Sequence, residues 1–389
     1  MSVTAPRGFV AAGVAAGIKA SGAADLALVA NGEGAVPAAG VFTANLAAAA
    51  PVQVSRAHLA ATGGRAAAVV LSSGNANAAT GAPGRAAAQR MCALVGEALG
   101  TPADEVLVCQ TGLIGIPLPL AQVERGIGPL VAARRPGAEA GARAAAAIMT
   151  TDTVRKEVVV EGPGFTVGAM AKGAAMLAPN MATMLAVLTT DAVAEPDVLA
   201  RALRGAVAGT FNRLSVDGCT STNDTVLVLA NGATGTAPGP AALEAALAEA
   251  CGELAQMMAA DAEGATKVFH VVVRGARSDE EAHRGARKVA ESQLVQCSIN
   301  GEDPYWGRVV SELGSAGVAF DIDAVAVAYG GVVVCRHGVA ADHDAEAVRS
   351  HMQGRAIEVT CDLGLGPGSG AVLSTDLGHG YIDENRTTS

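Results

Sequence analysis

The sequence is poor in aromatic side chains, with one Trp, three Tyr and six Phe among 389 residues. Cores built on stacked rings are therefore excluded, and the interior must be filled mainly by Ala, Val, Leu and Met. Positive charge is also scarce: 27 Lys and Arg face 37 Asp and Glu, which gives a net charge of −10. No long basic run occurs, and this argues against nucleic acid as the main partner.

The sequence also has few cysteines and few long apolar runs. The seven cysteines are scattered, odd in number and without a CxxC pair, which favours buried free thiols in a reducing compartment over disulfides or a zinc site. The uncharged stretch from Gly34 to Ser55 contains Pro37 and Pro51 and would be a poor membrane-spanning helix. The N-terminal residues lack a convincing signal-peptide core. We therefore expect a soluble cytoplasmic protein with no metal and no membrane partner.

The chain does contain a mixture of strand and helix patterns. Its 389 residues are too many for a typical single core, so two domains or lobes are expected. Short Val-rich runs predict strands at 66–71, 105–109, 157–160, 166–170, 225–230, 268–273, 325–328 and 331–334. Longer periodic segments predict helices at 82–99, 138–149, 197–207, 241–262 and 345–352. This mixture predicts an α/β or mixed α+β fold.

Glycine and proline mark several boundaries. Gly100 follows a predicted helix as its C-terminal cap, and Pro240 opens the long helix over 241–262. The glycine-rich segment Gly364–Gly370 resembles a phosphate loop, but it lacks the GK[ST] ending and no clear helix follows it. We expect an ordinary loop between strands there.

One segment carries a specific chemical signal. The run from Lys172 to Met184 places Thr183 directly after the small residue Ala182, close to the turn-forming Pro179-Asn180. A threonine in such a place could cut its own preceding peptide bond and become an N-terminal residue. Its new α-amino group has a pKa near neutrality and could then act as the base that activates its own hydroxyl. The alternative is an ordinary Thr in a buried Met- and Leu-rich element.

Motifs over most of the chain favour the first interpretation. They begin with 8–19 (GFVAAGVAAGIK) and continue with 73–77 (SGNAN), 110–115 (QTGLIG), 148–153 (IMTTDT), 172–191, 212–217 (NRLSVD), 220–225 (TSTNDT), 263–267 (EGATK) and 303–308 (DPYWGR). In this order they resemble the ornithine acetyltransferase family, the glutamate N-acetyltransferases of arginine biosynthesis. The resemblance implies a two-lobed α/β fold and self-cleavage into an N-terminal chain, 1–182, and a C-terminal chain, 183–389. It also implies that the fragments stay associated as a heterotetramer of two chains of each kind.

The resemblance implies roles for the catalytic residues. Thr183 is the nucleophile, and Thr111 with Gly112 matches the pair that stabilises the oxyanion. A hydroxyl beside a glycine suits this role, because a side-chain donor and an unobstructed backbone N–H can converge on one oxygen. Without the resemblance, an ordinary turn would be the better interpretation of Thr-Gly. Lys172 is expected at the substrate carboxylate or at the reacting centre, although eleven positions separate it from Thr183.

Further residues match the family's substrate contacts. Glu263 is expected to hold the positively charged amino group of ornithine, for which a carboxylate is the right chemistry. Thr150 and Thr151 both fit the Thr-Thr-Asp-Thr motif, and the sequence does not choose between them. The C-terminus departs from the family pattern, because it is one residue short and lacks an aromatic. Asn385 and Ser389 are the best matches there, with Thr388 as the alternative to Ser389.

The expected reaction is a ping-pong acetyl transfer. Thr183 would take acetyl from N2-acetylornithine, release ornithine and pass the acetyl group to glutamate, which gives N-acetylglutamate. No cofactor is expected, and acetyl-CoA would be a second donor if the enzyme is bifunctional. Two alternatives stay open: a self-cleaving amidase or aminopeptidase that passes the acyl group to water, and a non-catalytic protein with a vestigial site.

Overall fold

The computed structural model describes residues 2–178 and 184–386, which form two compact units. Unit 1 contains the described residues up to 212 together with 220–258, and unit 2 contains 213–219 and the described residues from 259 onward. The expectation of two lobes is thus confirmed. The predicted division at 182/183 is a covalent one that lies inside unit 1, and it stays a prediction.

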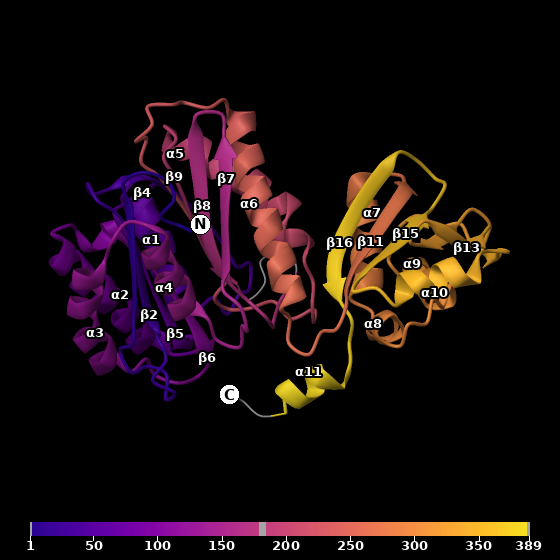
Figure 1. Ribbon diagram of the computed structural model, residues 1–389, viewed down its shortest axis with the longest axis horizontal. Coiled ribbons are helices and arrows are strands. Elements are labelled where there is room, and N and C mark those ends of the chain that lie inside the picture. The colour runs from indigo at the N-terminus through magenta and orange to yellow at the C-terminus, as the bar shows by residue number, and fades with distance from the viewer. Residues whose placement is uncertain (1, 179–183, 387–389) are drawn as a thin grey trace. The chain divides into compact units, whose positions relative to one another are not determined.

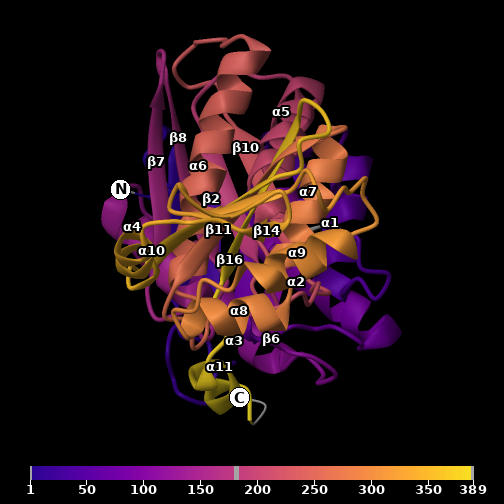
Figure 2. The same cartoon turned by 90° about the vertical axis from the view of Figure 1, so that its right-hand side faces the viewer.

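Unit 1 contains two β-sheets (Figures 1 and 2). The first has the order β1-β2-β5-β6, with bounds Phe9–Val14, Leu26–Asn31, Ala68–Asn75 and Val106–Leu113. The second has the order β4-β3-β10-β9-β8-β7, with bounds Arg65–Ala66, Val36–Phe42, Thr225–Ala230, Leu185–Thr190, Phe165–Lys172 and Lys156–Gly162. Within each sheet one neighbouring pair is parallel, β5 with β6 and β9 with β10, and the other pairs are antiparallel.

Six helices complete this unit among the described residues. They are α1 (Ala50–Ala61), α2 (Gly81–Leu99), α3 (Leu120–Ala133), α4 (Ala138–Ile148), α5 (Pro196–Gly209) and α6 (Pro240–Ala260), the last of which ends just inside unit 2. Gly100 ends α2 in the left-handed conformation at φ +74°, and Pro240 opens α6, as predicted.

Alternation along the central strands builds two apolar layers in unit 1. In β5, Val69 and Leu71 point into a core shared by the two sheets, whereas Val70 points to the opposite face and packs with Met91 of α2 and Leu130 of α3. Both faces of the strand are buried, which explains why its sequence is a continuous apolar run. Figure 1 shows α5 and α6 beside the six-stranded sheet, so unit 1 is layered helix, sheet, sheet, helix.

Unit 2 contains one sheet of six strands in the order β14-β13-β12-β15-β11-β16. In that order the strands span Val339–Ala340, Val332–Arg336, Ala326–Tyr329, Ala356–Asp362, Val268–Ala276 and Gly368–Thr375. The helices are α7 (Asp279–Ala290), α8 (Gln293–Asn300), α9 (Trp306–Gly314), α10 (Ala345–Met352) and α11 (His379–Glu384). The glycine-rich segment from Gly364 joins β15 to β16, which confirms the expected loop between strands.

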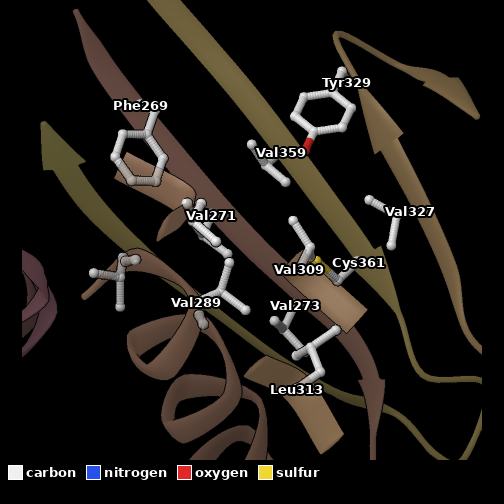
Figure 3. Close-up of a cluster of buried hydrophobic side chains, with 14 of the residues drawn as sticks. Phe269, Val271, Val273, Val289, Val309, Leu313, Val327, Tyr329, Val359 and Cys361 are labelled. Atoms are coloured by element: carbon white, nitrogen blue, oxygen red, sulfur yellow. The ribbon is translucent and has the colours of Figure 1, made fainter. Parts of the chain in front are cut away.

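Figure 3 shows how the core of unit 2 is filled with few aromatic rings. Phe269 and alternate valines of β11 pack against Val289 of α7 and Leu313 of α9. Trp306 lies at the start of α9 and packs, partly buried, against this cluster. Five of the seven free cysteines are buried, but Cys219 and Cys297 are exposed, so the expectation of buried thiols holds only in part. No helix among the described residues is long and apolar enough to cross a membrane.

Candidate active site

Thr111 and Gly112 lie near the end of β6, beside the parallel strand β5. The register pairs Thr111 with Ser73 and Gly112 with Gly74. Gly112 has φ +129°, and a Cβ at this position would come within 2.3 Å of the Gly74 carbonyl carbon. Only glycine therefore fits at position 112. Because glycine has no side chain, the backbone of residue 112 next to the buried Thr111 is left uncovered.

Lys172 is the last residue of β8, and the sheet brings it to this same place. Its Nζ lies 3.5 Å from the Thr111 Oγ1, at the limit of a hydrogen bond, and its side chain is 4% exposed. The antiparallel register pairs Lys172 with Leu185 of β9. The chain therefore leaves the sheet at Lys172 and re-enters it directly opposite, two residues after position 183. This pairing places Lys172 opposite Leu185, which lies thirteen positions later in the sequence. Ala182 and Thr183 themselves lie outside the described residues.

Asp152 joins Lys172 to the segment that carries Thr150 and Thr151. Its Oδ1 accepts hydrogen bonds from the Lys156 Nζ and the Gly173 N–H, both at 2.7 Å. Its Oδ2 accepts from the Thr150 N–H at 3.1 Å and lies 3.8 Å from the Lys172 Nζ. Burial by itself would raise the pKa of this carboxyl, but the charges of Lys172 and Lys156 and the hydrogen bonds from the Lys156 Nζ and the Gly173 N–H hold it at about 2.

The two threonines of this segment differ in their surroundings. Thr150 is half-buried and its backbone is fixed by Asp152, whereas Thr151 is exposed. An open cavity of about 570 Å³ is lined by residues on both sides of this pair in the sequence, Met149, Thr153, Val154, Arg155 and Glu157, but by neither threonine. The choice between Thr150 and Thr151 as a substrate contact stays open.

Asp224 is a second buried carboxyl in this region, and our sequence interpretation gave it no role. It directly precedes β10, and its Oδ1 accepts a hydrogen bond from the Met184 N–H at 3.1 Å. Its Oδ2 has no hydrogen-bond partner among the described residues. Burial raises the pKa of this carboxyl well above its ordinary value, against the opposing effects of the Met184 N–H, the nearby Ser221 hydroxyl and the Lys172 charge. An acidic residue directly before a buried strand that is apolar after Thr225 was the signal available in the sequence.

The neighbouring Asn223 explains how the strand ends are held in place. Its Nδ2 donates to the Ala76 carbonyl at 2.6 Å and to the Gln110 carbonyl at 2.9 Å. One buried amide therefore ties the entrance of β10 to the chain just beyond β5 and to the residue before Thr111.

Unit 2 carries the other predicted substrate residues. The Asn385 Nδ2 donates to the Glu263 Oε2 at 2.8 Å and to the Tyr381 carbonyl at 3.0 Å. Gly264 has φ +64°, and a Cβ there would come within 2.0 Å of the Tyr381 backbone nitrogen, so α11 packs directly on the Glu263 turn. The structure thus brings Glu263 and Asn385 together. Thr388 and Ser389 lie outside the described residues.

The arrangement in unit 1 offers the parts of an acyl-transfer site. A hydroxyl, a glycine backbone and a buried ammonium lie beside the point where the chain resumes after position 183, and such donors suit a developing oxyanion. Among the described residues, no three or more His, Cys, Asp or Glu side chains gather as metal ligands would.

Comparison with known proteins shows the family of the chain. The ArgJ family model matches residues 10–387. A Mycobacterium bovis protein named arginine biosynthesis bifunctional protein ArgJ is 48% identical over 393 residues, which cover 100% of this chain and 96% of that protein. A Thermobifida fusca protein of the same name is 48% identical over 390 residues and is covered completely, as is this chain.

Solved structures of two similar proteins cover about half of the chain. A crystal structure of Mycobacterium tuberculosis ornithine acetyltransferase complexed with ornithine is 49% identical, covers 47% of this chain and 96% of the solved chain, and has a TM-score of 0.45. The arginine biosynthesis bifunctional protein of Bacillus halodurans is 33% identical, covers 51% of this chain and 96% of the solved chain, and has a TM-score of 0.49.

Proposed function

This chain belongs to the ArgJ family and is an acetyltransferase of arginine biosynthesis; from that premise we propose that it carries acetyl from N2-acetylornithine to glutamate on Thr183. The single observation that best supports this route is the Lys172–Leu185 register. It pairs Leu185, two residues after position 183, with Lys172, whose Nζ lies 3.5 Å from the Thr111 Oγ1.

The proposed reaction begins with cleavage of the Ala182–Thr183 bond. The freed α-amino group takes the proton of the Thr183 hydroxyl, which attacks the acetyl carbonyl of N2-acetylornithine. Thr111 and Gly112 stabilise the tetrahedral oxyanion, and ornithine leaves with the proton. Glutamate then attacks the acetyl ester through its amino group, and N-acetylglutamate leaves while Thr183 regains its hydroxyl.

Substrate binding divides into two kinds of contact. The buried ammonium of Lys172 suits a substrate carboxylate, with Thr150 or Thr151 beside it, and the Glu263 carboxylate suits the side-chain ammonium of ornithine. The Asn385 hydrogen bond supports this role of Glu263, because it fixes the carboxylate through Oε2. Ser389 or Thr388 is assigned to the same subsite.

We assign no resident cofactor to the reaction and propose acetyl-CoA as a second donor, a role supported by the word bifunctional in the relatives' names. We also propose a cytoplasmic heterotetramer of two chains of each kind. Consumption of acetyl-CoA with glutamate as the only other substrate tests the second donor. The mass of the native assembly tests the heterotetramer.

Intact-protein mass spectrometry under denaturing conditions tests the core of the proposal. We expect two fragments split at 182/183 and, after incubation with N2-acetylornithine, one acetyl group on the C-terminal fragment. Thr183→Ala should give a folded, uncleaved and inactive precursor, whereas normal cleavage of this variant would contradict the assignment of Thr183. Acetate release that glutamate does not suppress would favour the hydrolase. A single intact chain that carries no acetyl label would favour the non-catalytic protein with a vestigial site.

A further inference from the structure

The N-terminal motif at 8–19 ends in Lys19, which has no role in the proposed reaction. Lys19 lies in the loop between β1 and β2 and is half-buried. Its Nζ donates hydrogen bonds to the Ala24 carbonyl at 2.8 Å and to the Met149 carbonyl at 2.7 Å. The second bond spans 130 positions of sequence and reaches the residue directly before Thr150.

The loop that carries Lys19 is folded around the side chain of Asp25. This fully buried carboxylate accepts hydrogen bonds from four consecutive backbone N–H groups, those of residues 16, 17, 18 and 19, at 2.6–3.1 Å. Gly17 has φ +88°, a left-handed conformation that lets successive N–H groups converge on one anion. The backbone of Lys19 is therefore fixed by a carboxylate of the chain itself.

The same loop contacts the strand that pairs with β6. The Ser73 N–H donates to the Asp25 carbonyl at 2.9 Å, and a Cβ on Gly74 would lie 3.0 Å from the Lys19 Cγ. The apolar stem of Lys19 thus passes directly over Gly74, which the register pairs with Gly112. Lys19 therefore reaches Met149 from the strand beside the proposed oxyanion backbone.

Lys19 also stabilises the chain at the end of α4. The last carbonyls of a helix have no partner within it, and a cation is favoured beside them. The Ser73 hydroxyl donates to one of them, the Ala147 carbonyl, at 2.6 Å. Lys19 binds the carbonyl of Met149, which directly follows the helix and has an extended backbone with φ −61° and ψ 147°. Two side chains from other parts of unit 1 thus hold the chain where it leaves α4 toward Thr150.

The peptide between Met149 and Thr150 is held from both sides. The Met149 carbonyl and the Thr150 N–H belong to the same planar group. The Lys19 ammonium donates to the carbonyl, and the Asp152 Oδ2 accepts from the N–H at 3.1 Å. Hydrogen bonds to charged groups are the strong ones, so this peptide cannot turn without breaking two of them. Its orientation decides how the chain enters the Thr150-Thr151 pair.

We propose that Lys19 is a positioning residue of the acetyl-transfer site and that Asp25 sets it in place. Lys19 orients the peptide between Met149 and Thr150, and through it the threonine pair that meets the carboxylate shared by N2-acetylornithine and glutamate. This inference rests on the proposed function. It gives the end of the N-terminal motif a task in substrate binding, although Lys19 lies far from the threonine pair in sequence.

Steady-state kinetics of Lys19→Met test this role. The variant loses the ammonium and keeps an unbranched stem that can lie over Gly74. Because the peptide before Thr150 is no longer held, the KM values for N2-acetylornithine and for glutamate should both rise about tenfold, while kcat stays within about twofold. A general loss of folded enzyme would instead lower kcat and leave both KM values in place.

A second variant tests the link between Asp25 and Lys19. Asp25→Asn replaces one acceptor oxygen of the loop by an N–H donor, so the same two KM values should rise by about threefold or more. Because Asp25 acts through Lys19, the double variant Asp25→Asn/Lys19→Met should have KM values within about twofold of those of Lys19→Met. Effects that multiply in the double variant would overturn this link.

A matched control lies at the other end of α4. The Arg135 Nη1 donates to the Ala132 carbonyl at 2.9 Å and to the Arg134 carbonyl at 2.8 Å, just before the helix begins. Arg135→Met also removes a cation that binds two backbone carbonyls, but it leaves the peptide before Thr150 untouched. Both of its KM values should stay within about twofold of the original.

Unchanged KM values in Lys19→Met, or a loss confined to kcat, would overturn the inference. If Lys19→Met does not fold, Lys19→Gln takes its place, because its amide is neutral and reaches less far, and its KM values decide by the same criterion. The unmodified protein tests the proposed function separately. If it transfers acetyl while the KM values of the Lys19 variants match its own, the function stands and only the positioning role is lost.

Discussion

Two buried carboxyls of unit 1 show how strongly position controls an acid. Asp152 lies among lysines and N–H donors, and its pKa is about 2. Asp224 is also buried, and burial raises its pKa well above the ordinary value, against the opposing effect of the hydrogen bond from the Met184 N–H. The difference comes from the donors supplied by neighbouring strands, which a linear sequence does not display.

The low pKa of Asp152 predicts an acid-dependent loss of stability. Its contribution is fully present above its ordinary pKa of 3.8 and is lost as the pH falls toward about 2. Over this window the free energy of unfolding should fall by about 2 kcal/mol more in the unmodified protein than in Asp152→Asn. Urea unfolding at pH 5 and near pH 2.5 measures this, and an equal loss in both proteins would contradict it.

The raised pKa of Asp224 predicts the opposite trend. The folded protein keeps a proton that the unfolded chain releases above pH ~4, so this carboxyl costs stability as the pH rises toward its folded pKa. Asp224→Asn cannot ionise and should lose less stability between pH 5 and 8. Melting temperatures across that range test this, and parallel curves for the two proteins would show that Asp224 is ionised in the fold.

At the scale of elements, the end of β6 depends on one backbone conformation. Gly112→Ala would force a Cβ into the Gly74 backbone at φ +129°, which should cost about 2–4 kcal/mol and reduce transfer strongly. Gly115→Ala is the matched control, since Gly115 also has a positive φ, +82°, but a Cβ there would meet no atom within 4 Å. Denaturant unfolding should show a loss of only about 1 kcal/mol for the control.

Some elements could be predicted from sequence because their local signals agree with their environment. The strand at Thr225–Ala230 and the helix at Ala345–Met352 were predicted with their observed bounds. Others were missed: β1 and β2 consist largely of small or apolar residues without clear alternation, and α1 begins at an Ala-Pro pair within a stretch interpreted only as uncharged. The signals of α7, an N-capping Ser278 and an acidic first turn, were present but overlooked.

The candidate site was predictable to a similar degree. The family motifs pointed to Thr111, Gly112 and Lys172, and the structure brings these three together. Asp152 stood within the Thr-Thr-Asp-Thr motif without a role, because only the sheet shows that it meets Lys156 and Lys172 at once. Lys156 has the sequence surroundings of a surface lysine, although its side chain is fully buried.

At the scale of the whole molecule, the predicted cleavage point separates strands of one sheet from each other and does not separate the two lobes. In the order β4-β3-β10-β9-β8-β7, the adjacent strands β9 and β10 follow position 183, and they lie between β3 and β8, which precede it. Each of the predicted chains therefore supplies strands that pair with strands of the other. The unit could not be assembled from either chain alone.

This interleaving predicts that the two fragments stay together after cleavage. A tag on the N-terminal fragment should retain the C-terminal fragment through native purification and through high salt, because backbone hydrogen bonds and apolar packing hold the sheet. Separation should need denaturant. Recovery of the tagged fragment alone from native buffer would contradict the shared sheet.

The same interleaving changes the molecularity of folding. Before the cut, β9 reaches its place between β8 and β10 by an intramolecular step that does not depend on protein concentration. After the cut, a denatured molecule can regain the sheet only by a bimolecular encounter of its two pieces, so its apparent stability rises with concentration. Cleavage would thus make maturation a one-way event: dilute mature enzyme, once unfolded, should refold far more slowly than its uncut precursor.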